Sequence, residues 1–107
     1  MNIRDFIKAE NEKRLTEFVV VPEWNNEKVF YQKISSQEYS KISKALEKDQ
    51  MMGMIDAIIM KAEYEDGSRM FTMADRAMLS EYRHPSVIIS LAGKILDTLT
   101  PEVAEKN

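Results

Sequence analysis

The spacing of apolar and polar residues separates one strand-like region of the chain from several helical ones. The segment 17–21 is short and rich in β-branched residues, and the segment 28–34 places alternate side chains on two faces. Both patterns are typical of strands. A polar, turn-rich segment around Trp24 joins them, which predicts a β-hairpin over about 17–34. Because two strands alone are only marginally stable in water, helices are expected to cover one face of this hairpin.

Helical spacing governs both sides of the hairpin. Residues 2–15 predict a short, charged, amphipathic helix with apolar positions at Ile3, Phe6 and Ile7. After the hairpin, Ser35 and Glu38 have the spacing of a capping box, which marks the start of a second helix. The apolar stripe of that second helix is expected to consist of Tyr39, Ile42 and Leu46.

Three further segments complete the expected architecture. A helix over about 50–63 is followed by a turn, for which Gly67 supplies the positive φ. Thr72 then caps a helix, with Phe71 as a hydrophobic staple before it, and Ser86 caps a last helix over 87–99. The fold class is therefore expected to be α+β and mostly α, with the hairpin packed against four to five helices. All of residues 1–107 are expected to form a single domain.

Two of these helices carry more apolar surface than an ordinary surface helix, whose apolar stripe is a little over ~100° wide. In the stretch "MMGMIDAIIM", residues 51–60, one face is apolar and Met60 lies on the opposite side. The helix over 87–99 leaves only four residues for water. Two interpretations remain open: one helix is central and fully enclosed, or one apolar face contacts a second subunit or a client protein.

The methionines strengthen the second interpretation without excluding the first. Apart from Met1, all of them lie between residues 51 and 78. Methionine suits surfaces that adapt to varied apolar partners, although it also fills gaps in cores. From the apolar helices and the hairpin we nominate eight candidate residues for self-association or partner binding: Trp24, Met52, Met54, Ile59, Met60, Ile88, Ile89 and Leu96.

Composition narrows the classes of protein to consider. The chain of 107 residues is 31% charged and 44% apolar, which is typical of a globular protein. A net charge of -3 gives no general attraction to nucleic acid or to an anionic membrane. The absence of cysteine excludes a disulfide scaffold, a thiol nucleophile and a thiolate zinc site. With no signal-peptide pattern and no run of transmembrane length, we expect a complete cytosolic product.

Catalytic chemistry finds little support in the sequence. His84 has no histidine or cysteine partner, and Glu63, Glu65 and Asp66 lack the ligand spacing of an EF-hand. Nothing combines a nucleophile, a base and an orienting group, so we expect no enzyme, cofactor or metal. Two alternatives stay open: an enzyme whose site assembles only in an oligomer, and nucleic-acid binding by a local patch of Lys28, Lys33, Lys41 and Lys44.

The order of segments resembles the tail assembly chaperone family of long-tailed, siphovirus-type bacteriophages. A hairpin with a tryptophan precedes a capped helix and an apolar helix in this family. A turn-and-cap segment follows, matched here by Asp66, Gly67, Arg69, Phe71, Thr72 and Asp75. The chain then closes on a polar tail, matched by Leu99, Thr100, Glu102, Glu105, Lys106 and Asn107. The resemblance covers about residues 17–107.

The resemblance implies a protein without catalytic residues that multimerises and binds the tape-measure protein. It would keep this apolar client soluble until the major tail protein, a further candidate partner, polymerises around it. The expected location is the host cell cytoplasm and not the mature virion, and members of the family often have a longer, frameshifted product. An alternative is a small adaptor or regulatory module that binds one partner through the hairpin edge or Trp24.

Overall fold

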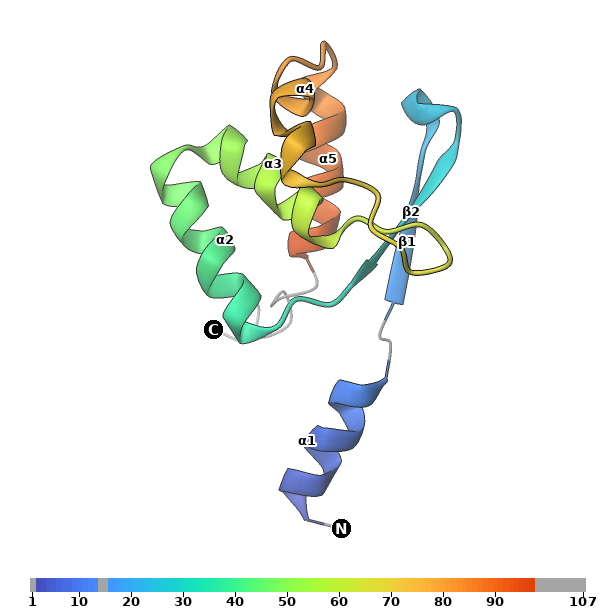
Figure 1. Cartoon of the computed structure of the whole chain (residues 1–107), viewed down its shortest axis with the longest axis vertical. Coiled ribbons are helices and arrows are strands. Elements are labelled where there is room, and N and C mark those ends of the chain that lie inside the picture. The colour runs from blue at the N-terminus through green and yellow to red at the C-terminus, as the bar shows by residue number, and fades with distance from the viewer. Residues whose placement is uncertain (1, 14–15, 98–107) are drawn as a thin grey trace.

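The protein is described by a computed structural model that places residues 2–13 and 16–97 (Figure 1). Its elements are α-helices, two short 3-10 helices and one antiparallel hairpin, so the expected class of α+β, mostly α, is confirmed. The elements in chain order are α1 (Ile3–Glu12), β1 (Thr16–Val21), η1 (Pro22–Trp24), β2 (Glu27–Gln32), α2 (Ser36–Lys48), α3 (Gln50–Lys61), η2 (Met73–Asp75), α4 (Arg76–Ser80) and α5 (Pro85–Leu96).

The hairpin forms where alternation predicted it. Thr16 pairs with Gln32 at one end of the ladder and Val21 pairs with Glu27 at the other. The chain reverses at the tip through Asn25 and Asn26, which both adopt positive φ, a conformation that asparagine tolerates better than most residues. The second strand ends two residues earlier than expected.

Helix α3 occupies the centre of the molecule. It packs against α2 and α5 and also contacts α4, η2 and β2, as Figure 1 shows for the main helices. Its buried residues therefore lie on more than one side of the helix: Gly53, Ile55, Ala57, Ile58, Ile59 and Lys61. The surplus apolar surface of residues 51–60 is thus largely covered within the chain, as the enclosed-helix interpretation expects.

The joint between α2 and α3 is a single residue. Asp49 ends α2 and also caps α3, where its carboxylate accepts a hydrogen bond from the Met52 amide at 3.1 Å. The two helices then pack so closely that a Cβ on Gly53 would lie 2.7 Å from both the Cα and the N of Leu46. Glycine at this position therefore permits the close approach of the two backbones.

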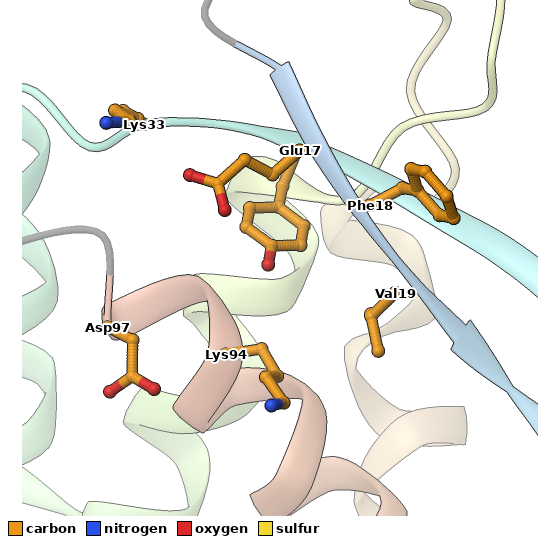
Figure 2. A pocket seen from close by; sticks show the side chains of 7 residues that line it. Glu17, Phe18, Val19, Lys33, Lys94 and Asp97 are labelled. Atoms are coloured by element: carbon orange, nitrogen blue, oxygen red, sulfur yellow. The ribbon is translucent and has the colours of Figure 1, made fainter.

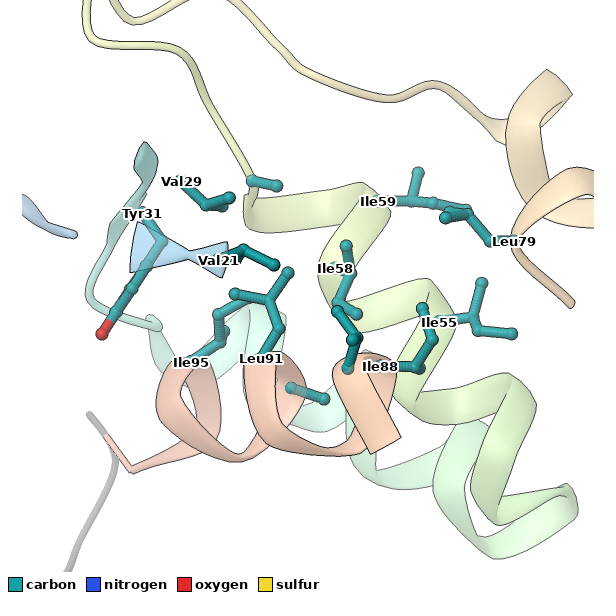
Figure 3. Close-up of a cluster of buried hydrophobic side chains, with 13 residues drawn as sticks. Val21, Val29, Tyr31, Ile55, Ile58, Ile59, Leu79, Ile88, Leu91 and Ile95 are labelled. Atoms are coloured by element: carbon teal, nitrogen blue, oxygen red, sulfur yellow. The ribbon is translucent and has the colours of Figure 1, made fainter. Parts of the chain in front are cut away.

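The core lies between α3, α5 and the hairpin (Figure 3). Val29 from β2, Ile58 from α3 and Ile95 from α5 have no exposed surface. Tyr31 lies at one end of this cluster and Leu79 of α4 at the other, as Figure 3 shows. Burying side chains of this size provides most of the favourable free energy of folding.

Several boundaries and exposures differ from the sequence expectations. The last helix begins with Pro85 as its first residue, and His84 rather than Ser86 occupies the cap position; proline suits a first turn because it needs no hydrogen-bond donor there. Thr72 does form the expected capping box, but it opens a short 3-10 turn before α4. Tyr39 is half exposed although its neighbour on the stripe, Ile42, is buried.

Lys61 is the one charged residue in the core of the described chain, with 6% of its surface exposed. Its ammonium donates to the Glu38 carboxylate at 2.8 Å and to the Lys33 carbonyl at 3.4 Å. The same carboxylate oxygen accepts from the Ser35 amide at 3.0 Å, completing the capping box predicted for α2. One side chain thus ties the start of α2 to the end of α3.

This arrangement predicts a specific dependence of stability on pH. Burial alone would raise the pKa of Glu38, but hydrogen bonds and the charge of Lys61 lower it below the ordinary value of 4.5. Stability gained from the charged carboxylate is therefore fully present above about pH 4.5 and is lost as pH falls through the lowered pKa of the folded state.

Replacing Glu38 with glutamine should reduce the free energy of unfolding at pH 7 by about 1–2 kcal/mol, because Lys61 loses its counter-charge in a partly screened site. The difference from the wild type should shrink as pH falls below 4.5. Urea denaturation curves between about pH 3 and pH 7 measure this difference in the free energy of unfolding. Glu47→Gln, on an exposed part of the same helix, is the control and should leave the difference near zero.

Candidate protein-binding surface

Large apolar side chains are exposed in several separate places on the molecule. On α1, all three apolar residues expected to define its face are at least half exposed, and the helix buries no residue. Others lie on β1, around η2 and α4, and on α5. These exposed side chains are Ile3, Phe6, Ile7, Phe18, Val20, Met73, Met78 and Ile89.

An aromatic pocket lies between the hairpin tip and α4, and we call it the Trp24 pocket. Its volume is about 250 Å³, and its lining comprises Trp24, Phe71, Met78, Leu79 and Tyr82. Trp24 meets the Phe71 and Tyr82 rings edge to face, with centroids 5.8 and 6.3 Å apart. Such edge-to-face contacts fix the orientation of the indole beyond what burial alone would do.

The polar atoms of this pocket satisfy one another. The Trp24 indole N–H donates to the Tyr82 hydroxyl at 3.0 Å. No charged side chain lines the pocket. Its chemistry therefore favours an uncharged, apolar side chain of a partner, and the flexible Met78 at its edge, 54% exposed, can adapt to different shapes.

A second apolar depression, the Met60 groove, lies between α2, α3 and η2 and has a volume of about 390 Å³. Its apolar lining consists of Ile42, Ala45, Ile59, Met60 and Met73.

Three charged residues border the Met60 groove: Lys41, Asp56 and Arg69. Asp56 is engaged by Arg76 of α4 at 2.8 Å, and the Arg69 guanidinium donates to the Ile59 carbonyl at 2.8 Å. The groove thus has an apolar floor and charges of both signs at its border. This combination suits an amphipathic helix, whose apolar stripe is flanked by polar residues.

A polar hollow of about 500 Å³ separates β1 from the last turn of α5 (Figure 2). Glu17 and Asp97 contribute carboxylates, while Lys33 and Lys94 contribute ammonium groups. Burial raises the pKa of the Tyr31 phenol in this hollow, and the charges of Glu17 and Asp97 raise it further, so the hydroxyl remains protonated. The opposing charges leave no net attraction for an ion of either sign.

The nominated residues divide into three groups in the structure. Ile59 and Ile88 are core residues with at most 2% of their surface exposed, and Ile59 also lies at the base of the Met60 groove. Met52, Met54 and Leu96 are half-buried, and both methionines pack against the core.

The remaining three nominated residues lie at accessible places. Ile89 is exposed on α5, Met60 lines its groove, and Trp24 lines the pocket at the hairpin tip. The nominated residues therefore do not form one continuous patch.

Sequence reasoning did not single out Met73 and Met78, although both lie in the methionine-rich segment. Met73 follows the Thr72 cap, and Met78 lies within α4, whose five residues give too little periodicity to separate an inner face from an outer one. The Arg69 and Phe71 positions of the family-like motif serve the Met60 groove and the Trp24 pocket respectively.

The described residues show no site for metal chemistry, since no three histidine or acidic side chains converge among them. His84 lies against the Tyr82 ring, with centroids 5.4 Å apart. Within the same part of the chain, no helix combines the length and the apolar character needed to span a bilayer. The tail residues from Leu99 to Asn107 lie outside the described residues.

Comparison with known proteins finds a likeness among the solved structures. No family model matches the chain, and no curated protein matches it. The solved structure of the bacteriophage HK97 tail assembly chaperone does match, with a TM-score of 0.66. The match covers 90% of this chain and 99% of the other at 17% sequence identity. The resemblance inferred from the order of segments is thereby confirmed at the level of the fold.

Proposed function

We propose that this chain, which has the fold of a phage tail assembly chaperone, is itself a non-enzymatic chaperone of tail assembly. The observation that carries the proposal is the coverage of the structural match, which spans nearly the whole of both chains. Since a shared fold alone does not fix function, the proposal also relies on the surface. Two of its depressions, the Met60 groove and the Trp24 pocket, have mainly apolar linings that include methionine.

The client we propose is the tape-measure protein, a long apolar chain that must remain soluble before the tail tube forms. The Met60 groove is the proposed client site, because it has an apolar floor and charges of both signs at its border. Methionines at 60 and 73 allow the groove to accept successive segments of different sequence. Several copies of the chaperone bound along one client would cover more of it than one copy could.

Co-expression with the tape-measure protein of the same genome tests this function. The soluble fraction of the client should rise in the presence of the wild-type chain, and the client should co-purify with several copies of it. Met73→Asp should lower the soluble fraction of the client by roughly tenfold, since a charge in the groove costs on the order of 1–3 kcal/mol of binding. Met73 is 63% exposed, so the variant should fold normally.

Two further variants complete the design. Tyr64→Asp places the same charge at another exposed apolar position, outside the groove, and should leave client solubility unchanged. Met60→Asp alters the floor of the groove. For this variant, client solubility is measured together with helix content by circular dichroism. If Met60→Asp abolishes helicity, Met60 serves packing and only Met73 reports on binding. A client that stays insoluble with the wild-type chain contradicts the proposed function.

The proposed role also includes partners and a location. We infer that the chain acts in the host cell cytoplasm, associates with itself, and hands the client to the major tail protein as the tube polymerises. It should then be absent from finished particles. Mass spectrometry of purified virions checks this, since a structural tail protein would appear there in fixed proportion to the tube.

One observation favours a second candidate function. The Trp24 pocket is small and apolar, and an edge-to-face contact with Phe71 orients its indole, which suits one anchoring side chain of one defined partner, as in an adaptor module. An adaptor would be a monomer or dimer with a single partner and would not alter the solubility of the tape-measure protein. The co-expression experiment therefore separates the two functions.

A further inference from the structure

The hairpin has one edge that is paired and one that is open. Beside β2, Phe30 exchanges backbone hydrogen bonds with Glu63 at 2.9 and 2.7 Å, and Glu63 in turn bridges to Arg69. Beside β1, no residue that the structure describes extends the sheet, which has two strands. Within the described part of the chain, the outer side of β1 is therefore a free strand edge.

The contacts of Phe30 establish which residues of β1 direct their backbone groups outward. Hydrogen-bonded and non-hydrogen-bonded pairs alternate along an antiparallel ladder. Because the N–H and C=O of Phe30 are directed to Glu63, its pair with Phe18 is a non-hydrogen-bonded one. The N–H and C=O of Phe18 therefore point away from β2, and the alternation gives Val20 the same orientation. Each of these two residues offers one donor and one acceptor along the open edge.

Strand β1 lacks the features that usually protect such an edge. Its pairing with β2 is continuous over residues 16–21, without a bulge, and proline occurs only after the strand has ended, at Pro22. Its one charged residue, Glu17, lines the hollow beside α5, and the side chains of Phe18 and Val20 are 52% and 41% exposed. Natural edge strands are normally blocked by charge, proline or a bulge, so this edge can accept a further strand.

Helix α5 provides a wall along this edge, because it packs against β1. Two hollows lie between the helix and the strand: the polar hollow at Glu17 (Figure 2) and a second one of about 330 Å³ nearer the hairpin tip. Val19 lines both of them, Phe18 lines the first and Val20 the second, so together they follow β1 along its length. The polar residues that α5 contributes recur at helical spacing: Ser86, Ser90, Lys94 and Asp97.

The length and chemistry of the two hollows fit a short extended segment. From Ser86 to Asp97 the axis of α5 rises about 16 Å, which corresponds to about five residues of a strand. Near the hairpin tip the lining is apolar at the buried Val21 and Leu91, whereas the other end carries charges of both signs. An uncharged segment with apolar side chains at alternate positions therefore suits this site.

We propose that the open edge of β1 binds an extended segment of a partner polypeptide as an additional strand, with α5 beneath its inward side chains. An extended backbone has free donors and acceptors that match the outward groups of Phe18 and Val20, whereas a helix uses these groups within its own turns. A second copy of this chain would bring its own α5 to the same edge, beside the first. The inference goes beyond the proposed function, since the site is separate from the Met60 groove and its ligand is a strand.

A capped peptide of six residues that alternates threonine and valine tests the inference on the purified, full-length chain. In NMR spectra, the bound peptide should protect the amides of Phe18 and Val20 from exchange with deuterated solvent. The amides of Val19 and Val21 already bond within the ladder, so their exchange should change much less. The inference is overturned by a peptide that does not bind at about 1 mM, or that binds without protecting Phe18 and Val20.

Two methylated forms of the peptide show whether its backbone carries the binding. N-methylation of alternate residues removes the donors on one edge of an extended strand and leaves those on the other edge. One alternating set should therefore weaken binding roughly a hundredfold, for two lost hydrogen bonds, whereas the other set should leave the affinity within about threefold. Equal losses with the two sets would indicate apolar adhesion and contradict an added strand.

Substitutions on the protein side provide an independent test. Val20→Pro removes an outward donor and no ladder hydrogen bond, at a position where an edge strand tolerates proline. It should weaken peptide binding roughly tenfold, whereas Val20→Thr keeps the N–H and should bind as the wild type does. Ser90→Arg fills the hollow from an exposed position of α5 and should also weaken binding; Ser40→Arg, at an exposed position of α2, is its matched control.

Circular dichroism and thermal melting verify that these variants fold. If Val20→Pro does not fold, Ser90→Arg and the methylated peptides decide the question. Wild-type affinity in a folded Val20→Pro chain, or in Ser90→Arg, contradicts binding at this edge. A second copy as the occupant would protect the amides of Phe18 and Val20 in the wild type alone, increasingly with protein concentration, and would exclude the peptide; that result also overturns the inference.

The outcome is separable from that of the proposed function, because the peptide assay contains no client. Peptide binding at the β1 edge beside a client that stays insoluble in co-expression rejects the chaperone function and keeps the edge site. A soluble client together with a peptide that does not bind rejects the edge site and leaves the chaperone function in place.

Discussion

Replacing Ile58 with alanine is expected to lower the free energy of unfolding by about 3 kcal/mol, within the usual range for deleting a buried aliphatic side chain. Ile58 has no exposed surface and lies where α3 meets α5 and the hairpin. The loss combines the transfer of the deleted methyl and methylene groups with the cavity they leave. The melting temperature should fall by roughly 10 °C for a domain of this size.

Ile89→Ala provides the matched control, because it removes the same atoms from a helical isoleucine that is 47% exposed. The free energy of unfolding should change by less than about 0.5 kcal/mol there. Urea denaturation at one low protein concentration measures both variants, which keeps self-association from adding to apparent stability. Equal losses for the two isoleucines would contradict the placement of α3 at the centre of the core.

Gly53→Ala should be destabilising although alanine is the better helix former. The new Cβ would meet the backbone of Leu46 at 2.7 Å, and a backbone cannot rotate away as a side chain can. Overpacking of this kind costs about 1–3 kcal/mol, and the gain in helix propensity returns up to about 1 kcal/mol. We expect a net loss near 1–2 kcal/mol with α2 displaced from α3.

Gly93→Ala is the same substitution with the opposite expected sign. No atom lies within 4 Å of a Cβ built at Gly93 on the outer side of α5. The variant should gain about 0.5–1 kcal/mol from helix propensity and from a less flexible unfolded chain. Thermal melts of the two glycine variants side by side give the comparison. A gain at both positions would mean that α2 and α3 are not closely packed.

Local signals in the sequence predicted the elements well. The capping box of Ser35 and Glu38, the turn at Gly67 and the hairpin around Trp24 all depend on residues within a few positions of one another. Such features are encoded by side chains that bond to nearby backbone atoms, so spacing alone reveals them. The mixed, mostly helical class followed from these elements and their periods.

Which face of each helix is buried depends on residues that lie far away in the sequence. Trp24 and Tyr82 are 58 positions apart, and no local pattern indicates their hydrogen bond. A helical wheel of the α3 sequence shows surplus apolar surface. It cannot show that α2 and α5 pack against this helix from two sides. Tyr39 was assigned to the apolar stripe of α2 for the same reason. Periodicity shows which residues share a helix face, but it does not show whether another element covers each of them, and Tyr39 is half exposed.

The candidate surface was predictable only in part. The sequence located Met60 and Trp24, which line the two apolar depressions, but it also nominated Ile88, which the core encloses, and Ile59, which is buried at the base of the Met60 groove. Both isoleucines were chosen because their helices are apolar nearly all round. A helix of that kind has no polar face that marks its outer side. The sequence therefore shows that apolar surface is in excess but not which part of it is exposed.

The central position of α3 has a consequence for the order in which the molecule opens. Backbone amides in α3 can exchange with solvent deuterium only after α2, α5 or the hairpin has moved away, because each of them covers part of this helix. Its slowest amides should therefore exchange through global unfolding, whereas those of α1 exchange through fraying of a single helix. Proteolysis that removes α1 should accordingly leave the α2, α3 and α5 assembly as a protected fragment.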